Sequence, residues 1–132
     1  MSPKPLSDLI IVVVEDHDDA RRYLGAFLRQ LGADVILARD AFQGIEAIRN
    51  SRPHLVVSDI QMPGADGFEL LRQIRALGSD SEGGGGVPVI AMTAFLGQAD
   101  RTRMLNTGFQ AFLPKPFTPE KFLETILTVL DR

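Results

Sequence analysis

Residues 9–16 read Leu-Ile-Ile-Val-Val-Val-Glu-Asp, a continuous apolar run that ends in two carboxylates. Four further short apolar runs follow along the chain at regular spacing: Val35–Ala38, Leu55–Val57, Val87–Ala91 and Phe109–Leu113. Runs that are continuous rather than alternating are typical of strands covered on both faces, which is the usual state of parallel strands. The pattern therefore predicts a buried, parallel, five-stranded sheet.

Segments with a helical spacing of apolar residues lie between the predicted strands. The first is predicted to be capped by Asp18 and to stop at Gly32. Four others are predicted over residues 41–51, 68–77, 97–107 and 118–130. The third of these four is the most polar, and we expect it to be weakly anchored.

Strands that alternate with helices indicate an α/β fold with right-handed crossovers. Five such units in 132 residues fit a flavodoxin-like, doubly wound sheet of strand order 2-1-3-4-5 with helices on both faces. A closed α/β barrel is excluded because it needs about twice this length.

Composition limits the possible classes of function. The chain is 45% hydrophobic and 23% charged, as expected for a globular protein. It has no cysteine, which excludes a disulfide framework, a thiolate metal site and a cysteine nucleophile, and we expect a cytoplasmic protein. A net charge of −3 gives no general nucleic-acid footprint, and the longest apolar run, Leu9–Val14, is too short to span a membrane. Residues 1–7 lack the features of a secretory signal and are predicted to form a flexible leader.

Polar residues stand at the ends of four predicted strands: Glu15-Asp16, Ser58-Asp59, Met92-Thr93-Ala94 and Pro114-Lys115-Pro116. In an open parallel sheet the carboxyl ends of the strands share one edge, where ligands bind. Each residue alone has a structural explanation, since acidic residues often cap helices and most lysines are solvated. Together they predict a site with three carboxylates, a hydroxyl and an ammonium group.

Clustered carboxylates repel one another, and a divalent cation removes that repulsion. Mg²⁺ takes oxygen ligands, of which Asp16 and Asp59 can supply two and a backbone carbonyl just after Asp59 a third. A metal beside an acidic nucleophile, with a lysine and a hydroxyl opposite, suits phosphoryl transfer. The acceptor would be an aspartate that becomes an acyl phosphate.

Four motifs in this order carry a resemblance: Val-Val-Val-Glu15-Asp16, Val-Val-Ser-Asp59-Ile-Gln-Met-Pro-Gly-Ala-Asp-Gly67, Ala-Met-Thr93-Ala94 and Phe112-Leu-Pro-Lys115-Pro-Phe. With them, residues 8–131 resemble the receiver domain of two-component response regulators. The resemblance implies a phosphoacceptor signalling domain, not a conventional enzyme, which assists its own phosphorylation and slow dephosphorylation. It fits a stand-alone regulator or the receiver of a hybrid histidine kinase, and we expect no output domain on the chain.

The resemblance also assigns roles to the residues at the strand ends. It makes Asp59 the phosphoacceptor, while Thr93 bonds the phosphoryl group and Lys115 pairs with it. It implies a Mg²⁺ site formed by Asp16 and Asp59 directly, Glu15 through water and the backbone carbonyl of Gln61.

Other positions are implied to control the response. Thr93 and Phe112 would form the switch, and Gln61 and Phe95 would tune the lifetime of the phosphorylated state. Phe112 stands where tyrosine is frequent, so the switch cannot use a phenolic hydroxyl, and its alternative is an ordinary core residue.

Two further features depart from the pattern or stand outside it. Glu15 occupies a place where aspartate is commoner, and its longer arm suits a contact through water. His17 and His54 lie beside charged or proline residues, and we expect a chemical role for neither.

The partners implied by the resemblance are a histidine kinase or a histidine phosphotransfer protein, and a downstream protein. That target would bind a face formed by the fourth helix, the fifth strand and the fifth helix, without direct nucleic-acid contact or membrane insertion. One alternative is a scaffold of the same fold that works without phosphorylation. Another is an aspartyl-phosphate phosphatase, although Gln61 stands where such enzymes carry a second aspartate. Flavin binding is disfavoured because the loop after the first strand is acidic.

Overall fold

The computed structural model describes residues 4–62, 66–78, 85–94, 102 and 106–132. Five parallel strands form one sheet in the order β2-β1-β3-β4-β5, which confirms the predicted fold class. The strands are β1 Ile10–Val14, β2 Asp34–Ala38, β3 Leu55–Asp59, β4 Val89–Thr93 and β5 Ala111–Pro114. The described helices are α1 Asp18–Gln30, α2 Ala41–Ser51, α3 Gly67–Arg75 and α5 Pro119–Val129.

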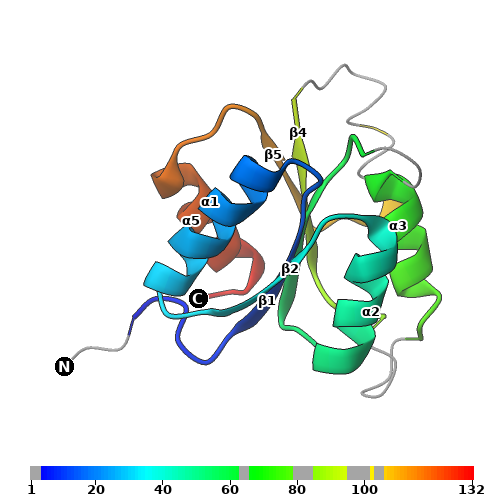
Figure 1. The fold of residues 1–132 in the computed structure, drawn as a ribbon, viewed down its shortest axis with the longest axis horizontal. Coiled ribbons are helices and arrows are strands. Elements are labelled where there is room, and N and C mark those ends of the chain that lie inside the picture. The colour runs from blue at the N-terminus through cyan, green and yellow to red at the C-terminus, as the bar shows by residue number, and fades with distance from the viewer. Residues whose placement is uncertain (1–3, 63–65, 79–84, 95–101, 103–105) are drawn as a thin grey trace.

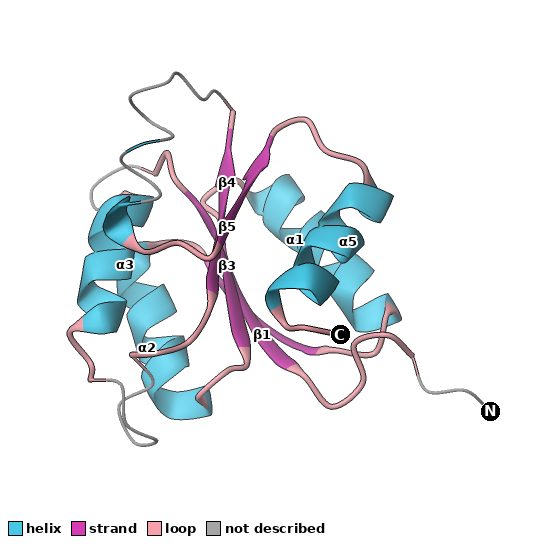
Figure 2. Ribbon diagram, turned by 180° about the vertical axis from the view of Figure 1, so that it is seen from behind, coloured by secondary structure: helices cyan, strands magenta, loops and turns pink. Residues whose placement is uncertain are grey.

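The sheet lies between two helical layers, with α1 and α5 on one face and α2 and α3 on the other (Figures 1 and 2). Successive side chains of β1 alternate between the two cores, so that Ile11 packs on the α1 and α5 side and Val12 on the α2 and α3 side. The rings of Phe27 and Phe122 stack at 5.7 Å and join α1 to α5. Burial on both faces explains why the strand sequences are continuous apolar runs.

The boundaries of α1 differ in part from the prediction. Asp18 is its first helical residue, and the N-cap position belongs to His17, whose side chain makes no capping hydrogen bond. The predicted stop is confirmed, because Gly32 has a φ of 104°. At this end the amides of Gly32 and Ala33 donate to the carbonyls of Arg29 and Leu28, and this reversal favours glycine because it needs a positive φ.

Two strands run further than their apolar composition indicates. β3 includes Asp59, which pairs with Met92, and β4 includes Thr93, which pairs with Pro114. The amide of Ile60 then donates to the carbonyl of Met92 at 2.9 Å. Backbone pairing with a neighbour sets these ends, and Asp59 and Thr93 are the last residues of their strands, which agrees with their predicted place at the strand ends.

The segment predicted as a leader, residues 1–7, contains a residue of the core. Leu6 is fully buried among the core residues beside α1, and its amide donates to the carbonyl of Leu31 at 2.9 Å. A large apolar side chain close to the domain gains more by burial than by staying in water. Residues 1–3 and most of the predicted helix 97–107 lie outside the described residues.

Within the described part of the chain, no helix combines the length and the apolar character needed to cross a bilayer.

Candidate functional site

The carboxyl ends of four adjacent strands bring the predicted residues to one edge of the sheet. Asp59 and Thr93 are the last residues of β3 and β4. Glu15 follows β1 directly, and Lys115 follows β5 directly. The strand order reverses between β1 and β3, and at such a switch point open α/β sheets leave a crevice for ligands.

Lys115 joins two of the carboxylates. Its Nζ lies 3.3 Å from Glu15 Oε1 and 3.5 Å from Asp59 Oδ2. Its backbone amide donates to the carbonyl of Thr93 at 2.6 Å, which ties the end of β5 to the end of β4. Both carboxylates are almost fully buried, whereas the Lys115 side chain is 32% exposed. One ammonium group therefore faces two buried negative charges.

The pKa values of Glu15 and Asp59 are shifted in opposite directions from their ordinary values. Burial raises the pKa of Asp59, the charge of Glu15 raises it further, and Lys115 only partly offsets both. Burial also acts to raise the pKa of Glu15, but the His17 amide, the charge of Lys115 and hydrogen bonds with the Asp16 and Lys115 side chains together outweigh it and hold that pKa below its usual value. Asp59 is thus the carboxylate whose ionised form most needs a further cation.

The surroundings of Asp16 are further evidence for a bound cation. Its Oδ1 is buried and has no hydrogen-bond partner among the residues that the structure describes. Ligand atoms of Glu15, Asp16, His17 and Asp59 all lie within 4.8 Å of one another. Because a buried oxygen without a partner is costly and carboxylates suit hard cations, these residues fit a divalent metal ion.

The segment after β3 is held close to Asp59. The amide of Gln61 donates to Asp59 Oδ1 at 3.2 Å, and the amide of Gly67 donates to the carbonyl of Ile60 at 2.9 Å. A Cβ atom on Gly67 would lie 2.7 Å from the carbonyl oxygen of Asp59. Glycine is therefore needed here for α3 to begin directly against the end of β3.

Arg21 is a site residue that the sequence analysis did not single out. Its Nη1 donates to the carbonyls of Glu15 at 3.0 Å and Asp16 at 3.5 Å. Its Nη2 bonds Asp18, and the side chain is only 14% exposed. The sequence does contain a sign of this role, because Arg21 follows Asp18 by three residues in the first turn of the helix. Side chains at this spacing can pair, and the paired arginine can then reach the end of the preceding strand.

The other predicted positions are placed as follows. Thr93 is buried, and half-buried Phe112 pairs with Ala91 in the sheet and packs against the core on the α2 and α3 side. Phe95 lies outside the described residues. His54 lies at the opposite edge of the sheet, where its Nδ1 accepts a hydrogen bond from the amide of Ile10 at 3.0 Å.

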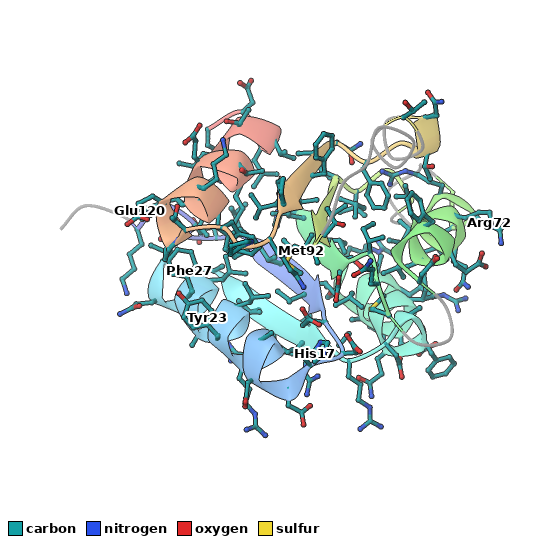
Figure 3. All side chains as sticks on the ribbon, turned by 90° about the horizontal axis from the view of Figure 1, so that it is seen from above. His17, Tyr23, Phe27, Arg72, Met92 and Glu120 are labelled. Carbon is teal, nitrogen blue, oxygen red and sulfur yellow. The ribbon has the colours of Figure 1, made fainter. Side chains whose placement is uncertain are left out.

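His17 differs from the sequence-based expectation. Its Nδ1 lies 3.3 Å from Glu15 Oε2 and 3.3 Å from Asp16 Oδ1. Figure 3 looks onto this edge and shows His17 where β1 passes into α1. The imidazole therefore belongs to the acidic cluster, and spacing along the chain did not reveal this.

Similar proteins share both the sequence and the architecture. The sequence model of the response regulator receiver domain matches residues 11–127. The chain is 36% identical over 121 residues to an uncharacterized 14.6 kDa protein of Leptolyngbya boryana, over 92% of this chain and 89% of that protein. It is 36% identical over 122 residues to the response regulator MprA of Mycobacterium sp. strain KMS, over 92% of this chain and 50% of MprA, so it spans about half the length of that relative.

A solved structure shows the same fold. The receiver domain of sensor histidine kinase PA1611 from Pseudomonas aeruginosa PAO1, with a magnesium ion coordinated in its active-site cleft, is 31% identical. The match has a TM-score of 0.81 and covers 94% of this chain and 98% of that one. With the fold, the acidic edge and the family match in agreement, this chain belongs to the response regulator receiver family, the phosphoacceptor domains of two-component signalling.

Proposed function

We propose that this chain accepts a phosphoryl group on Asp59 from the phosphohistidine of a histidine kinase or a histidine phosphotransfer protein. The observation that carries the proposal is the position of Lys115 Nζ, within 3.5 Å of carboxylate oxygens that follow or end two other strands. An ordinary surface lysine is solvated and does not pair with two buried carboxylates. A phosphoacceptor site, in contrast, requires a fixed cation beside its nucleophile.

The transfer is a displacement at phosphorus. One carboxylate oxygen of Asp59 attacks the phosphorus atom, the bond from phosphorus to the imidazole nitrogen breaks, and the electron pair stays on the departing imidazole. Lys115 and the Gln61 amide favour the ionised carboxylate that attacks. Lys115 then pairs with the phosphoryl oxygens, and the hydroxyl of Thr93 donates a hydrogen bond to one of them.

The chain's oxygen ligands fit Mg²⁺ as the cofactor. Asp16 and Asp59 would bind it directly, Gln61 through its backbone carbonyl and Glu15 through water, whereas Arg21 would hold the Glu15-Asp16 turn in place. Bound Mg²⁺ would neutralise negative charge on the phosphoryl oxygens. The buried Oδ1 of Asp16, which has no hydrogen-bond partner among the described residues, supports this assignment because a cation would satisfy it.

The response to phosphorylation would be a shift between two states. The acyl phosphate adds about two negative charges at neutral pH, by analogy with other phosphoryl groups. Thr93 would move toward it, and the ring of Phe112 would occupy the space that Thr93 leaves. Because the Lys115 amide ties β5 to β4, the face of β5, α5 and the segment 97–107 would change and bind a downstream protein.

Intact-mass measurement after incubation with a small-molecule phosphodonor tests this function. We expect a gain of one phosphoryl group that requires Mg²⁺, is absent in Asp59→Asn, and persists in Asp34→Asn, whose exposed carboxylate lies at the opposite edge. No gain under any condition would support a phosphorylation-independent scaffold instead. Rapid, repeated release of phosphate would support a phosphatase.

A further inference from the structure

We propose that His17 is a metal ligand, and that the acidic site therefore binds a first-row transition metal ion such as Co²⁺ more tightly than Mg²⁺. The inference rests on the proposed function only in using the same cation site. It concerns which ion that site prefers.

The position of the imidazole is the first observation. Its Nδ1 lies 3.3 Å from one oxygen of Glu15 and 3.3 Å from one oxygen of Asp16. With metal–ligand bonds of about 2.1 Å, two adjacent ligands of one ion lie about 3.0–3.4 Å apart. His17 Nδ1 thus stands at the separation from Asp16 Oδ1 that a shared ion requires, and at hydrogen-bond distance from Glu15 Oε2.

The second observation is that the side chain of His17 does not cap the helix that it precedes, although its carbonyl accepts a hydrogen bond from the amide of Arg21. It occupies the N-cap of α1, where a side chain commonly accepts a hydrogen bond from the first turn, but its side chain makes no such bond. The side chain is 74% exposed, yet Nδ1 is directed at the buried carboxylate of Glu15 and the partly exposed one of Asp16 rather than at the helix. The oxygen of Asp16 that it faces has no hydrogen-bond partner within the described part of the chain.

The chemistry of the donors determines the preferred ion. Mg²⁺ is bound by oxygen ligands and keeps several waters, so an imidazole adds little to its binding. Co²⁺, Ni²⁺ and Zn²⁺ favour a site that combines imidazole with carboxylates. His17 therefore adds selectivity for these ions to a site whose oxygens alone would suit Mg²⁺.

Calorimetric titration with Mg²⁺ and with Co²⁺, at about pH 8 where a free imidazole is neutral, tests the inference on the unphosphorylated protein. We expect Co²⁺ to bind more tightly than Mg²⁺. In His17→Phe, Co²⁺ affinity should fall at least about tenfold, since even partners that only orient a ligand change metal affinity by about 10–100-fold. Mg²⁺ affinity should change less than about twofold, because Mg²⁺ does not depend on a nitrogen ligand.

The matched control is His54→Asn, which removes the other imidazole of the chain but keeps an acceptor for the amide of Ile10. It should bind both ions as the wild type does. Pulsed electron paramagnetic resonance of bound Mn²⁺ provides a second readout. Coupling to a directly bound nitrogen should appear in wild type and in His54→Asn and be absent in His17→Phe.

Failures of the two proposals are distinguishable. If wild type and His17→Phe bind both ions with the same ratio of affinities and show no nitrogen coupling, His17 is not a ligand, and the inference falls while the Mg²⁺ site stands. If wild type binds Co²⁺ through a nitrogen but does not bind Mg²⁺, the inference stands and the proposed function loses its cofactor.

Discussion

The two edges of the sheet hold buried charge in opposite ways. At the carboxyl edge, Glu15 and Asp59 share one ammonium group, and one oxygen of Asp16 has no hydrogen-bond partner among the described residues. At the amino edge, the guanidinium of Arg75 meets an acceptor with both of its terminal nitrogens. The carboxyl edge has more negative charge than its own cations balance, whereas the amino edge is satisfied.

The bonds of the amino edge connect three segments. Arg75, the last residue of α3, donates to backbone carbonyls at 2.7–3.2 Å, those of Gly85, Val87 and Gly108. It also donates to Gln110 Oε1, which accepts from the amide of Val89 as well. These contacts join α3 to the starts of β4 and β5, which is a structural task that needs no ligand.

This contrast between the two edges indicates which of them binds ligands. A satisfied polar network contributes stability, and a network left incomplete destabilises the protein until a ligand completes it. Substitutions at the amino edge should therefore reduce stability and leave the phosphorylation chemistry intact. Substitutions at the carboxyl edge should change binding and chemistry, and some should increase stability.

The largest loss is expected for Arg75→Met, which keeps the apolar stem but removes every donor. The loss of several hydrogen bonds from a charged donor supports a decrease of about 3 kcal/mol in the free energy of unfolding. Urea denaturation measures it. Arg72→Met, in the same helix but 77% exposed, is the control and should change stability by less than about 0.5 kcal/mol. Equal effects of the two substitutions would contradict the structural role of Arg75.

Lys115→Met should cost about 2 kcal/mol, below the range for fully buried pairs because the ammonium is partly exposed. The loss arises because two buried carboxylates lose their cation. Urea denaturation at neutral pH without metal measures it. Adding Asp59→Asn to Lys115→Met should recover part of the loss, and an unchanged or larger loss in the double variant would mean that the two groups do not interact.

Arg21→Gln should weaken Mg²⁺ binding about tenfold, the effect of removing a group that orients metal ligands. Its hydrogen bonds hold the carbonyls of Glu15 and Asp16, the two residues that would place carboxylates on the ion. Calorimetric Mg²⁺ titration provides the readout. The adjacent Arg22→Gln, at an exposed position, should bind Mg²⁺ normally, and matching losses in both variants would indicate a general charge effect rather than positioning.

Asp59→Asn should increase stability in metal-free buffer by about 1 kcal/mol, because it removes a buried charge that the site does not balance. The raised pKa of Asp59 means that its contribution to stability is fully present below the pKa of the unfolded chain and is lost as pH rises through the folded pKa. The gain should therefore be near zero at about pH 3 and largest at neutral pH. Thermal unfolding across this range measures it.

The exposed Asp34→Asn is the control and should show no such pH-dependent gain. A loss of stability in Asp59→Asn at neutral pH would show that the carboxylate is well balanced without metal, and the contrast between the two edges would then fail.

The strand-end residues show what can be predicted from the sequence. Continuous apolar runs indicated strands that are buried on both faces. A parallel sheet of such strands brings four polar residues to one edge, whatever their side-chain rotamers: Glu15, Asp59, Thr93 and Lys115. The register of the strands could not be predicted from the sequence. The structure shows that the pairing of β3 and β4 with their neighbours includes Asp59 and Thr93. Periodicity predicts the face or edge of a residue because it depends on backbone geometry alone.

The partners of individual side chains were determined by the tertiary structure. Leu6 was predicted to be part of a leader and is buried. Arg21 was not singled out and holds the acidic turn. His17 was expected to have no chemical role and lies in the cluster. Each of these outcomes depends on which way a side chain turns and on what the fold brings near it. Glu15 and Lys115 are 100 residues apart in sequence.

The sequence alone thus determined the fold class and the edge at which the chemistry collects, since both follow from backbone periodicity and strand direction. Tertiary structure decided that Lys115 stands between two carboxylates. It also decided that one oxygen of Asp16 has no hydrogen-bond partner within the described part of the chain, and that an imidazole faces this oxygen. The physical reason is that the electrostatic energy of the site is a sum over charged groups that meet only after folding. The local sequence does not give the distances between these groups.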